Sequence, residues 1–321
     1  MGYSLGIDIG GTNIAAGVVD ENFNIIAKSK VKTNADRGYE AVLKDIVISG
    51  ELAVKEAGLK LSDMDRVGMG CPGTCNPESG LVEYSNNLRW ENVPLQKYVG
   101  AALGLTAYIE NDANAAALGE FYAGAARGSR NAVIITLGTG LGAGIIIEGR
   151  LFSGSNHAGA EIGHTVINVD GEECTCGRRG CFEAYCSATA LVKFTKRAIE
   201  SNPESVMVQI AEQEGKVSGR TAFNAAKLGD AAGQEVVDVF IKNLACGIIN
   251  TINIFQPEIL CIGGGVSNEG DTLLNPLKDR ISKEIYSKNS AHNTGIALCR
   301  LGNNSGIIGA ALLGRQFEHN S

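Results

Sequence analysis

The spacing of hydrophobic positions changes along the chain in a way that predicts alternating strands and helices. Residues 4–20 contain an apolar run, a glycine-rich turn and a second apolar run, a pattern typical of two buried strands joined as a hairpin. Residues 24–31 predict a third strand, and residues 39–57 carry apolar side chains at helical spacing up to Gly58. Strands that alternate with helices predict an α/β fold with layered sheets.

The same glycine-rich hairpin pattern recurs in the second half of the chain. Residues 132–148 read AVIITLGTGLGAGIIIE, again an apolar run, a glycine turn with Thr, and a run rich in β-branched residues. This internal repeat predicts two domains of similar plan. The other predicted strands cover residues 66–71, 107–110 and 258–262, and the other predicted helices cover residues 188–200, 234–255, 271–287 and 307–317.

Composition and charge narrow the class of protein. A chain of 321 residues can build two sizeable cores. The formal charge of −7, without any Lys/Arg-rich run, argues against nucleic acid as a partner. The first residues show no secretory signal pattern, and no apolar run approaches the roughly 20 residues that span a bilayer. Nine unevenly spaced cysteines do not suggest a disulfide framework, so we expect a cytoplasmic protein without a membrane partner.

Both glycine turns have the composition of phosphate-binding loops. The first, LGIDIGGTN, lacks the GK[ST] of a Walker A loop, and a strand rather than a helix follows it. A turn between strands can still present backbone N–H groups to a phosphate, and Asp8 could hold Mg²⁺ directly or through water. A tight hairpin needs glycine for conformational reasons alone. The repetition with Thr favours phosphate binding, and two such turns facing each other would clamp a triphosphate.

A dense polar cluster follows the predicted strand at 107–110. The segment IENDANAAALGE begins as a strand end and continues as a helix, which places Asp112 at or near the helix start. Asp112 could simply cap the helix, because Asp is a favoured cap residue. Alternatively, its carboxylate could accept the proton of an attacking hydroxyl. Spacing alone leaves both interpretations open.

Residues 161–183, EIGHTVINVDGEECTCGRRGCFE, concentrate metal-binding side chains. One imidazole and three thiols match a tetrahedral zinc site, and two carboxylates, Glu161 and Glu183, bracket them. The spacing C-x-C-x₄-C differs from the usual C-x₂-C pair, so three free buried cysteines remain an alternative. We interpret Cys186 as lying outside the ligand set. The candidate ligands are His164, Cys174, Cys176 and Cys181.

Seven motifs together resemble the ROK family, which groups bacterial sugar kinases with transcriptional repressors. They occur in family order over nearly the whole chain. The motifs are DIGGTN (8–13), PGT (72–74), ENDANAAALGE (110–120), LGTGLGAG (137–144), GAEIGH (159–164), CTCGRRGCFE (174–183) and IGGGVS (262–267).

The resemblance implies an actin-like ATPase fold, also called the hexokinase/Hsp70 fold, with two α/β domains around a cleft. The small domain would contain residues 1–112 plus about 305–321, with the first phosphate turn and the catalytic Asp at its boundary. The large domain would contain residues 113–304, with the second phosphate turn, the zinc site and the adenosine turn. Members of the family are often homodimers or homotetramers, and we expect one of these states.

The resemblance also implies a role for each candidate residue, with ATP, Mg²⁺ and a structural Zn²⁺ as cofactors. Asp112 would be the general base, and four protein ligands would leave the zinc no open position. ATP phosphates and Mg²⁺ would lie at Asp8, Gly10, Gly11, Thr12, Asn13, Gly138, Thr139 and Gly140, and adenosine at Gly264 and Gly265. Sugar hydroxyls would contact Asn111, Asp112, Glu161, His164 and Glu183, together with Gly73, Thr74 and Asn86.

A hexose kinase, with glucose converted to glucose 6-phosphate, is the function that this resemblance favours. Kinases of N-acetylmannosamine, N-acetylglucosamine and fructose share the same motifs and remain alternatives. A sugar-responsive repressor is disfavoured, because the first turn begins at Asp8 and leaves no room for a preceding helix-turn-helix. A catalytically dead sugar sensor is disfavoured because Asp112 and both glycine turns are intact.

Overall fold

The computed structural model describes residues 2–318 and separates into two compact units. The first unit contains the residues up to Ile134, residues 144–160 and the residues from Arg300 onward. The second unit contains residues 135–143 and 161–299. Each unit has its own hydrophobic interior and is described here by itself.

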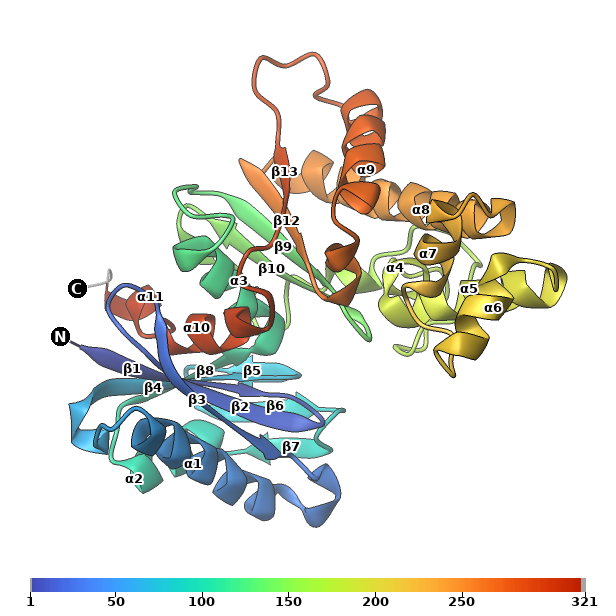
Figure 1. Ribbon diagram of the computed structural model, residues 1–321. Helices are drawn as coiled ribbons and strands as arrows, with labels where there is room; N and C mark the ends of the chain where they lie inside the picture. The colour runs from blue at the N-terminus through green and yellow to red at the C-terminus, as the bar shows by residue number, and fades with distance from the viewer. Residues whose placement is uncertain (1, 319–321) are drawn as a thin grey trace. The chain divides into compact units, whose positions relative to one another are not determined.

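The first unit is built on a five-stranded sheet with the order β3-β2-β1-β4-β8 (Figure 1). The three strands β1, β2 and β3 are antiparallel, which confirms the predicted hairpin and third strand. The strands β1, β4 and β8 are parallel, so their carboxyl ends meet at one edge, where Asp8 pairs with Gly70 and Gly70 with Glu110. The strands are β1 (Tyr3–Ile9), β2 (Asn13–Val19), β3 (Ile25–Lys32), β4 (Met64–Cys71) and β8 (Ala107–Asn111).

Side-chain alternation along β1 decides which helix packs on each face of this sheet. Leu5 and Ile7 are fully buried in the cluster that includes the apolar side chains of α1 (Tyr39–Glu56) and α2 (Leu95–Leu103). Gly6, between them, faces α10 (Ser305–Ala311), and a Cβ there would overlap the backbone of Ile307. Glycine at this position therefore lets α10 lie directly on the sheet (Figure 1).

The helix α10 also packs closely on α3 (Asp112–Ala123). A Cβ on Gly309 would overlap the carbonyl of Ala115, so the two helices approach through backbone contact. This packing keeps α3 in the first unit, whereas the predicted small domain ended at residue 112. The final segment of the first unit starts at Arg300 rather than at about residue 305.

Several short elements of the first unit lack a clear sequence pattern. A three-stranded sheet, β5-β6-β7, occupies residues 74–93, where we predicted no strand. The predicted helix over residues 307–317 is interrupted after Ala311, because the backbone turns at Leu312 and Leu313 through i→i+3 hydrogen bonds. These elements are β5 (Thr74–Asn76), β6 (Leu81–Ser85), β7 (Trp90–Val93), η1 (Ala35–Arg37), η2 (Leu61–Asp63), η5 (Gly302–Asn304) and α11 (Arg315–Glu318).

A second five-stranded sheet has the order β11-β10-β9-β12-β13. The hairpin strands β9 and β10 hold the places that β1 and β2 hold in the first sheet, and β12 and β13 are parallel like β4 and β8. The shared order confirms the predicted internal repeat. The strands are β9 (Ala132–Leu137), β10 (Leu141–Ile147), β11 (Arg150–Leu151), β12 (Ile259–Gly263) and β13 (Gly295–Leu298).

Helices make up most of the second unit. The helix α8 is long and apolar enough to cross a membrane by length and composition, which corrects the expectation that no such run exists. More than half of its apolar window is buried inside the structure, as expected of the core helix of a globular unit. The helices are α4 (Glu183–Cys186), α5 (Ala188–Ser201), α6 (Val206–Gln213), α7 (Thr221–Lys227), α8 (Ala231–Phe255), α9 (Asp271–Glu284), η3 (Ile162–His164) and η4 (Gly265–Glu269).

Candidate functional site

The junction between β8 and α3 fixes the position of Asp112. Asn111 is the residue that caps α3, because its Oδ1 accepts hydrogen bonds from the backbone N–H groups of Ala113 (2.9 Å) and Asn114 (3.2 Å). Asp112 is the first residue of the helix, so the interpretation of Asp112 as the cap is wrong. The Asn111 Nδ2 donates to the carbonyl of Gly73 at 3.0 Å, which joins two predicted sugar-contacting residues.

Asp8 and Asp112 form an acidic pair in the first unit. Burial, together with the nearby Asp112 carboxylate, raises the pKa of Asp8 to about 6. Burial also raises the pKa of Asp112, although a hydrogen bond from the backbone of Ala113 opposes this shift. Two carboxylates that repel each other in this way fit a divalent cation, because a hard cation with oxygen ligands would relieve the repulsion.

The first glycine turn is held by residues on both sides. The Gly10 N–H donates to the Asn13 carbonyl at 2.9 Å and closes the turn. Thr33 stabilises the turn with two hydrogen bonds. Its Oγ1 donates to the Gly10 carbonyl at 2.6 Å, and its backbone N–H donates to the Thr12 carbonyl at 3.1 Å. The sequence motif did not identify Thr33, because it lies twenty residues beyond the turn. The turn leaves Gly11 and Thr12 exposed at its tip.

A polar cavity of about 520 Å³ begins at this turn. It contains two cationic side chains, Lys32 and Arg89, that the motifs did not identify, since Arg89 comes close to the turn only through folding. The lining residues are Gly11, Thr12, Lys32, Asn34, Ala35, Asp36, Asn87 and Arg89.

The sugar-contacting residues predicted within 73–86 lie around β5 and β6. Gly73 has φ +110°, and a Cβ there would overlap the carbonyl of Tyr84, so the position requires glycine. Thr74 pairs with Tyr84 in the small sheet. Asn86 lies in the turn between β6 and β7, where its carbonyl accepts the N–H of Arg89 at 3.3 Å. The structure therefore brings Gly73 beside Asn111, and it places Asn86 in a neighbouring turn.

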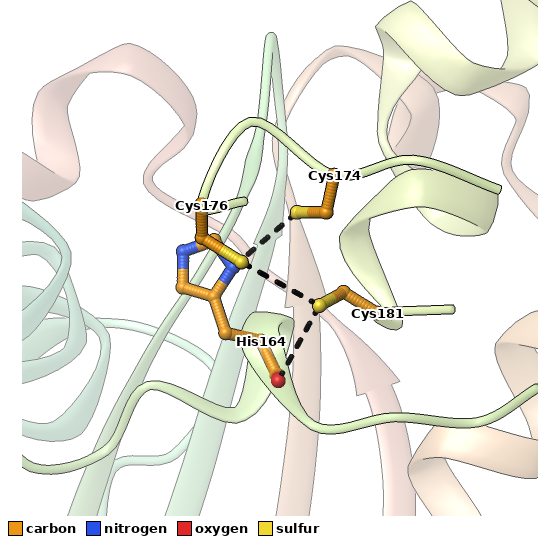
Figure 2. Close-up of side chains that lie close together, drawn as sticks. All are labelled: His164, Cys174, Cys176 and Cys181. Atoms are coloured by element: carbon orange, nitrogen blue, oxygen red, sulfur yellow. Dashed lines mark hydrogen bonds between the residues drawn. The ribbon is translucent and has the colours of Figure 1, made fainter. Parts of the chain in front are cut away.

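The four predicted zinc ligands converge on one point of the second unit (Figure 2). Their candidate ligand atoms all lie within 4.8 Å of one another. The Cys174 Sγ is 3.6 Å from the His164 Nδ1, and the Cys176 Sγ is 3.7 Å from the Cys181 Sγ. Zinc bonds of about 2.0 to 2.3 Å in a tetrahedron require ligand separations of roughly 3.5 to 3.8 Å. The residues therefore fit a zinc ion, with Nδ1 of the imidazole toward the metal.

Glu183 connects the metal loop with the second glycine turn. Its Oε2 accepts the backbone N–H of Leu141 at 2.8 Å, and its Oε1 accepts the Thr175 hydroxyl at 3.3 Å. Each carboxylate oxygen can accept a further hydrogen bond, so Glu183 can still contact a sugar hydroxyl. Glu161 is the exposed residue before η3, and its carbonyl accepts the N–H of His164 at 3.1 Å.

The second glycine turn is held by the start of α5. The Ala188 N–H donates to the Gly138 carbonyl at 2.8 Å, and the Thr189 hydroxyl donates to the Thr139 carbonyl at 2.8 Å. Gly264 has φ +84°, and a Cβ there would overlap the backbone of Leu137. Glycine therefore lets the end of β12 lie against the end of β9.

A second cavity, of about 550 Å³, lies beside these turns and includes Gly265. Lys216 and Arg220, from the segment before α7, lie in its lining. No motif marked these two residues, because their segment has no pattern of its own. The lining residues are Ala188, Glu214, Lys216, Ser218, Gly219, Arg220, Gly265, Val266, Asn268 and Glu269.

Comparison with known proteins identifies the family. Residues 4–316 match the model of the ROK family. The chain is 35% identical over 319 residues to a glucokinase of Streptomyces coelicolor, covering 98% of both chains. It superposes with a TM-score of 0.84 on a ROK family glucokinase from Streptomyces griseus, solved in complex with glucose and AMPPNP, at 34% identity and over 98% of this chain and 100% of that one.

The family also contains regulators. The chain is 30% identical over 311 residues to a xylose repressor of Caldicellulosiruptor bescii, covering 96% of this chain and 77% of the repressor. The family match extends over residues of both units. The chain belongs to the ROK family and has the actin-like ATPase fold of that family's sugar kinases.

Proposed function

We propose that the chain transfers the γ-phosphoryl group of ATP to the 6-hydroxyl of glucose, with Asp112 as general base. The observation that carries this proposal is the acidic pair of Asp8 and Asp112 at the end of β1 and the start of α3. A sugar hydroxyl is a poor nucleophile near neutral pH. A carboxylate whose pKa is raised by burial can position that hydroxyl and accept its proton.

The same proposal gives Asp8 a separate role. Asp8 would hold Mg²⁺, directly or through water, and the cation would neutralise negative charge on the phosphates. The exposed tip at Gly11 and Thr12 would present backbone N–H groups to a phosphate oxygen. In the second unit, Gly138 to Gly140 would do the same.

We assign the adenosine of ATP to the cavity that includes Gly265. Its volume of about 550 Å³ suits a nucleoside. The cationic groups of Lys216 and Arg220 lie in its lining and would favour a negatively charged nucleotide. Gly264, with its backbone against Leu137, keeps the cavity next to the second glycine turn.

We assign the recognition of sugar hydroxyls to polar groups of each unit, on the basis of the chemistry of those groups. Glu161 and Glu183 would accept hydrogen bonds from hydroxyls, because a carboxylate accepts without competing donors. The Nε2 of His164 is left for a hydroxyl when Nδ1 binds zinc. A zinc ion with four protein ligands would be structural and would hold this imidazole in place. Asn111, Gly73, Thr74 and Asn86 remain proposed contacts of the first unit.

A coupled ADP-release assay with Mg-ATP tests this function. The sugars are glucose, mannose, fructose, N-acetylmannosamine and N-acetylglucosamine, and we expect the highest kcat/KM with glucose. A higher kcat/KM with another sugar would replace glucose as the substrate but keep the reaction. No ADP release above background with any of the five would refute the proposal.

A substitution of Asp112 tests the mechanism. The change Asp112→Asn should lower kcat about 10²- to 10⁴-fold, the range expected when a general base is lost, and should leave glucose binding within about threefold. Asp271 offers a matched control, because it is also the first residue of a helix and is exposed. Asp271→Asn should keep the kcat of the wild type, and an Asp112→Asn enzyme with near wild-type turnover would exclude the role of general base.

A sugar-responsive repressor is the second candidate, since one relative is a xylose repressor. The formal charge of −7 and the absence of a Lys/Arg-rich run oppose binding to DNA. Phosphoryl transfer to glucose together with no retention of promoter DNA at about 0.1 M salt would favour the kinase. Salt-dependent retention of DNA without phosphoryl transfer would favour the repressor.

A further inference from the structure

A buried carboxylate lies two residues before the proposed catalytic residue. Glu110 is the residue of β8 two positions before Asp112, and only 6% of it is exposed. Glutamate is rarely buried to this extent unless it has partners. Its Oε1 accepts the backbone N–H of Asn111 at 2.8 Å and the side-chain Nδ2 of Asn114 at 3.0 Å. One oxygen therefore holds residues on both sides of Asp112.

Asn114 makes this arrangement costly to maintain. It is 3% exposed, and its Oδ1 has no hydrogen-bond partner among residues 2–318. A buried amide oxygen without a partner opposes folding. The bond from Nδ2 to Glu110 orients this amide on the first turn of α3. Polar groups retained at a cost in stability are expected where they serve function.

The charge on Glu110 adds a further cost. Burial raises the pKa of Glu110, and this shift is opposed by the hydrogen bonds from Asn114 and Asn111 and by the nearby His157. A well-packed apolar side chain would avoid the loss of hydration that the carboxylate suffers here. His157 itself has φ +57°, a backbone conformation that is strained for a residue with a side chain.

The two partners of Glu110 also determine where α3 begins. Asn111 caps the helix through its Oδ1, so the position of its backbone sets the position of the first helical turn. Asp112 lies in that turn and accepts the N–H of Ala113 at 2.9 Å. Loss of the Glu110 oxygen would free both Asn111 and Asn114, and the Asp112 carboxylate would move with them.

We propose that Glu110 is a positioning residue for Asp112, which it holds by accepting hydrogen bonds from Asn111 and Asn114. The proposal rests on the proposed kinase reaction. Glu110 takes no proton from the sugar, and its effect passes through the geometry of Asp112. A displacement of about 1 Å at a catalytic group can lower a rate about 10²-fold, so the effect is measurable.

Two substitutions separate the accepted hydrogen bonds from simple packing. Glu110→Gln keeps an oxygen for Asn111 and Asn114, and we expect kcat within about fivefold of the wild type. Glu110→Met keeps a similar volume without a strong acceptor, and we expect kcat about 10- to 100-fold lower. The KM values for glucose and ATP should stay within about threefold in both variants. The kcat is measured where both variants are folded, because the Met variant leaves two buried donors without an acceptor and should melt lower than the Gln variant.

Glu120, on the helix α3 that begins with Asp112, provides a matched control. It is also buried, and its carboxylate accepts the backbone N–H groups of Ala125 (2.8 Å), Arg300 (3.1 Å) and Leu301 (2.8 Å), all away from Asp112. Glu120→Gln should lower the melting temperature and leave kcat within about threefold, measured where the variant is folded. If Glu110 had only a structural role, its variants would likewise melt at a lower temperature and keep their kcat.

The outcomes distinguish this inference from the proposed function. A wild-type protein that phosphorylates none of the five sugars would refute the kinase reaction, and the inference would fall with it. An active wild type with an unimpaired Glu110→Met variant would refute the positioning role alone. Equal losses of kcat in the Gln and Met variants would also refute it, because the retained acceptor would then have no effect.

Discussion

Glu183 accepts a hydrogen bond from the backbone N–H of Leu141 at 2.8 Å. Glu183 follows the predicted zinc ligand Cys181 by two residues, and Leu141 directly follows the second glycine turn. The bond therefore joins the metal loop to the turn proposed for phosphate. The Glu183 Oε2 also occupies the space where a Cβ on Gly140 would lie. A change in the turn must consequently move a carboxylate that we assign to the sugar.

The substitution Gly140→Ala tests this connection. The added methyl group should displace the Glu183 carboxylate and weaken its bond to Leu141. Because a charge-assisted hydrogen bond contributes about 1.5 to 3 kcal/mol, we expect the glucose KM to rise roughly 10- to 100-fold. Gly295→Ala is the control, since a Cβ there would make only ordinary contacts. Steady-state kinetics with an unchanged glucose KM in Gly140→Ala would contradict the assignment.

The cysteine and histidine cluster should bind one zinc ion per chain, measured by elemental analysis of the purified protein. Cys176→Ala should abolish zinc binding and lower the melting temperature, because metal binding supplies folding free energy to a loop with little apolar core. The glucose KM should rise as His164 loses its anchor. Cys246→Ala, a cysteine outside the cluster, should retain the metal. Zinc-free protein that melts like the wild type would contradict a structural role.

Periodicity predicted the elements whose apolar residues follow a local pattern. The hairpin of β1 and β2 and the helix α1 are of this kind, because each buries one face that is visible in a window of a few residues. The small sheet at residues 74–93 has strands of three to five residues with mixed exposure, too short to show a period. The break after Ala311 is a turn at Leu312 and Leu313, and Gly314 beside it lies close to Arg66 from a distant part of the chain, which no local pattern reveals.

The candidate site residues also differ in whether a local motif marks them. Motifs predicted the glycine turns, Asp112 and the candidate zinc ligands, because each motif is contiguous or nearly so. Thr33, which holds the first turn, and Lys216, in the lining of the second cavity, come from segments without a motif. Folding of the first unit brings Thr33 to its turn, and folding of the second unit brings Lys216 to its cavity, so spacing along the sequence could not reveal either residue.

The rate of phosphoryl transfer should fall as the pH drops through about 6. Burial and the neighbouring carboxylate raise the pKa of Asp8 to about 6, and burial raises the pKa of Asp112 as well. Both groups must be ionised to act, since a protonated carboxyl neither holds Mg²⁺ nor accepts a proton. A profile of kcat/KM for glucose from pH 5 to 9 measures this limb. Bound Mg²⁺ should move it to lower pH, and a flat profile down to pH 5 would contradict these roles.

Asp8→Asn should stabilise the protein at neutral pH while it abolishes activity. The folded state raises the pKa of Asp8 from 3.8 to about 6, so it binds the proton more tightly than the unfolded state does. The stability of the wild type, measured without Mg²⁺, therefore falls as the pH rises from about 4 to 6, and above that the penalty stays constant. The Asn variant lacks this penalty and should gain about 1 to 3 kcal/mol at pH 7.

The gain in Asp8→Asn should disappear near pH 4, where Asp8 of the wild type is protonated in both states. Asp20 provides a control of opposite sign. Burial raises the pKa of Asp20, but hydrogen bonds from Asn24 and Asn22 outweigh this effect and lower it overall. Asp20→Asn should therefore destabilise the protein at pH 7. Chemical denaturation at pH 4 and 7 checks both variants, and an Asp8→Asn variant less stable than the wild type at pH 7 would show that the Asp8 carboxylate is not strained by its surroundings.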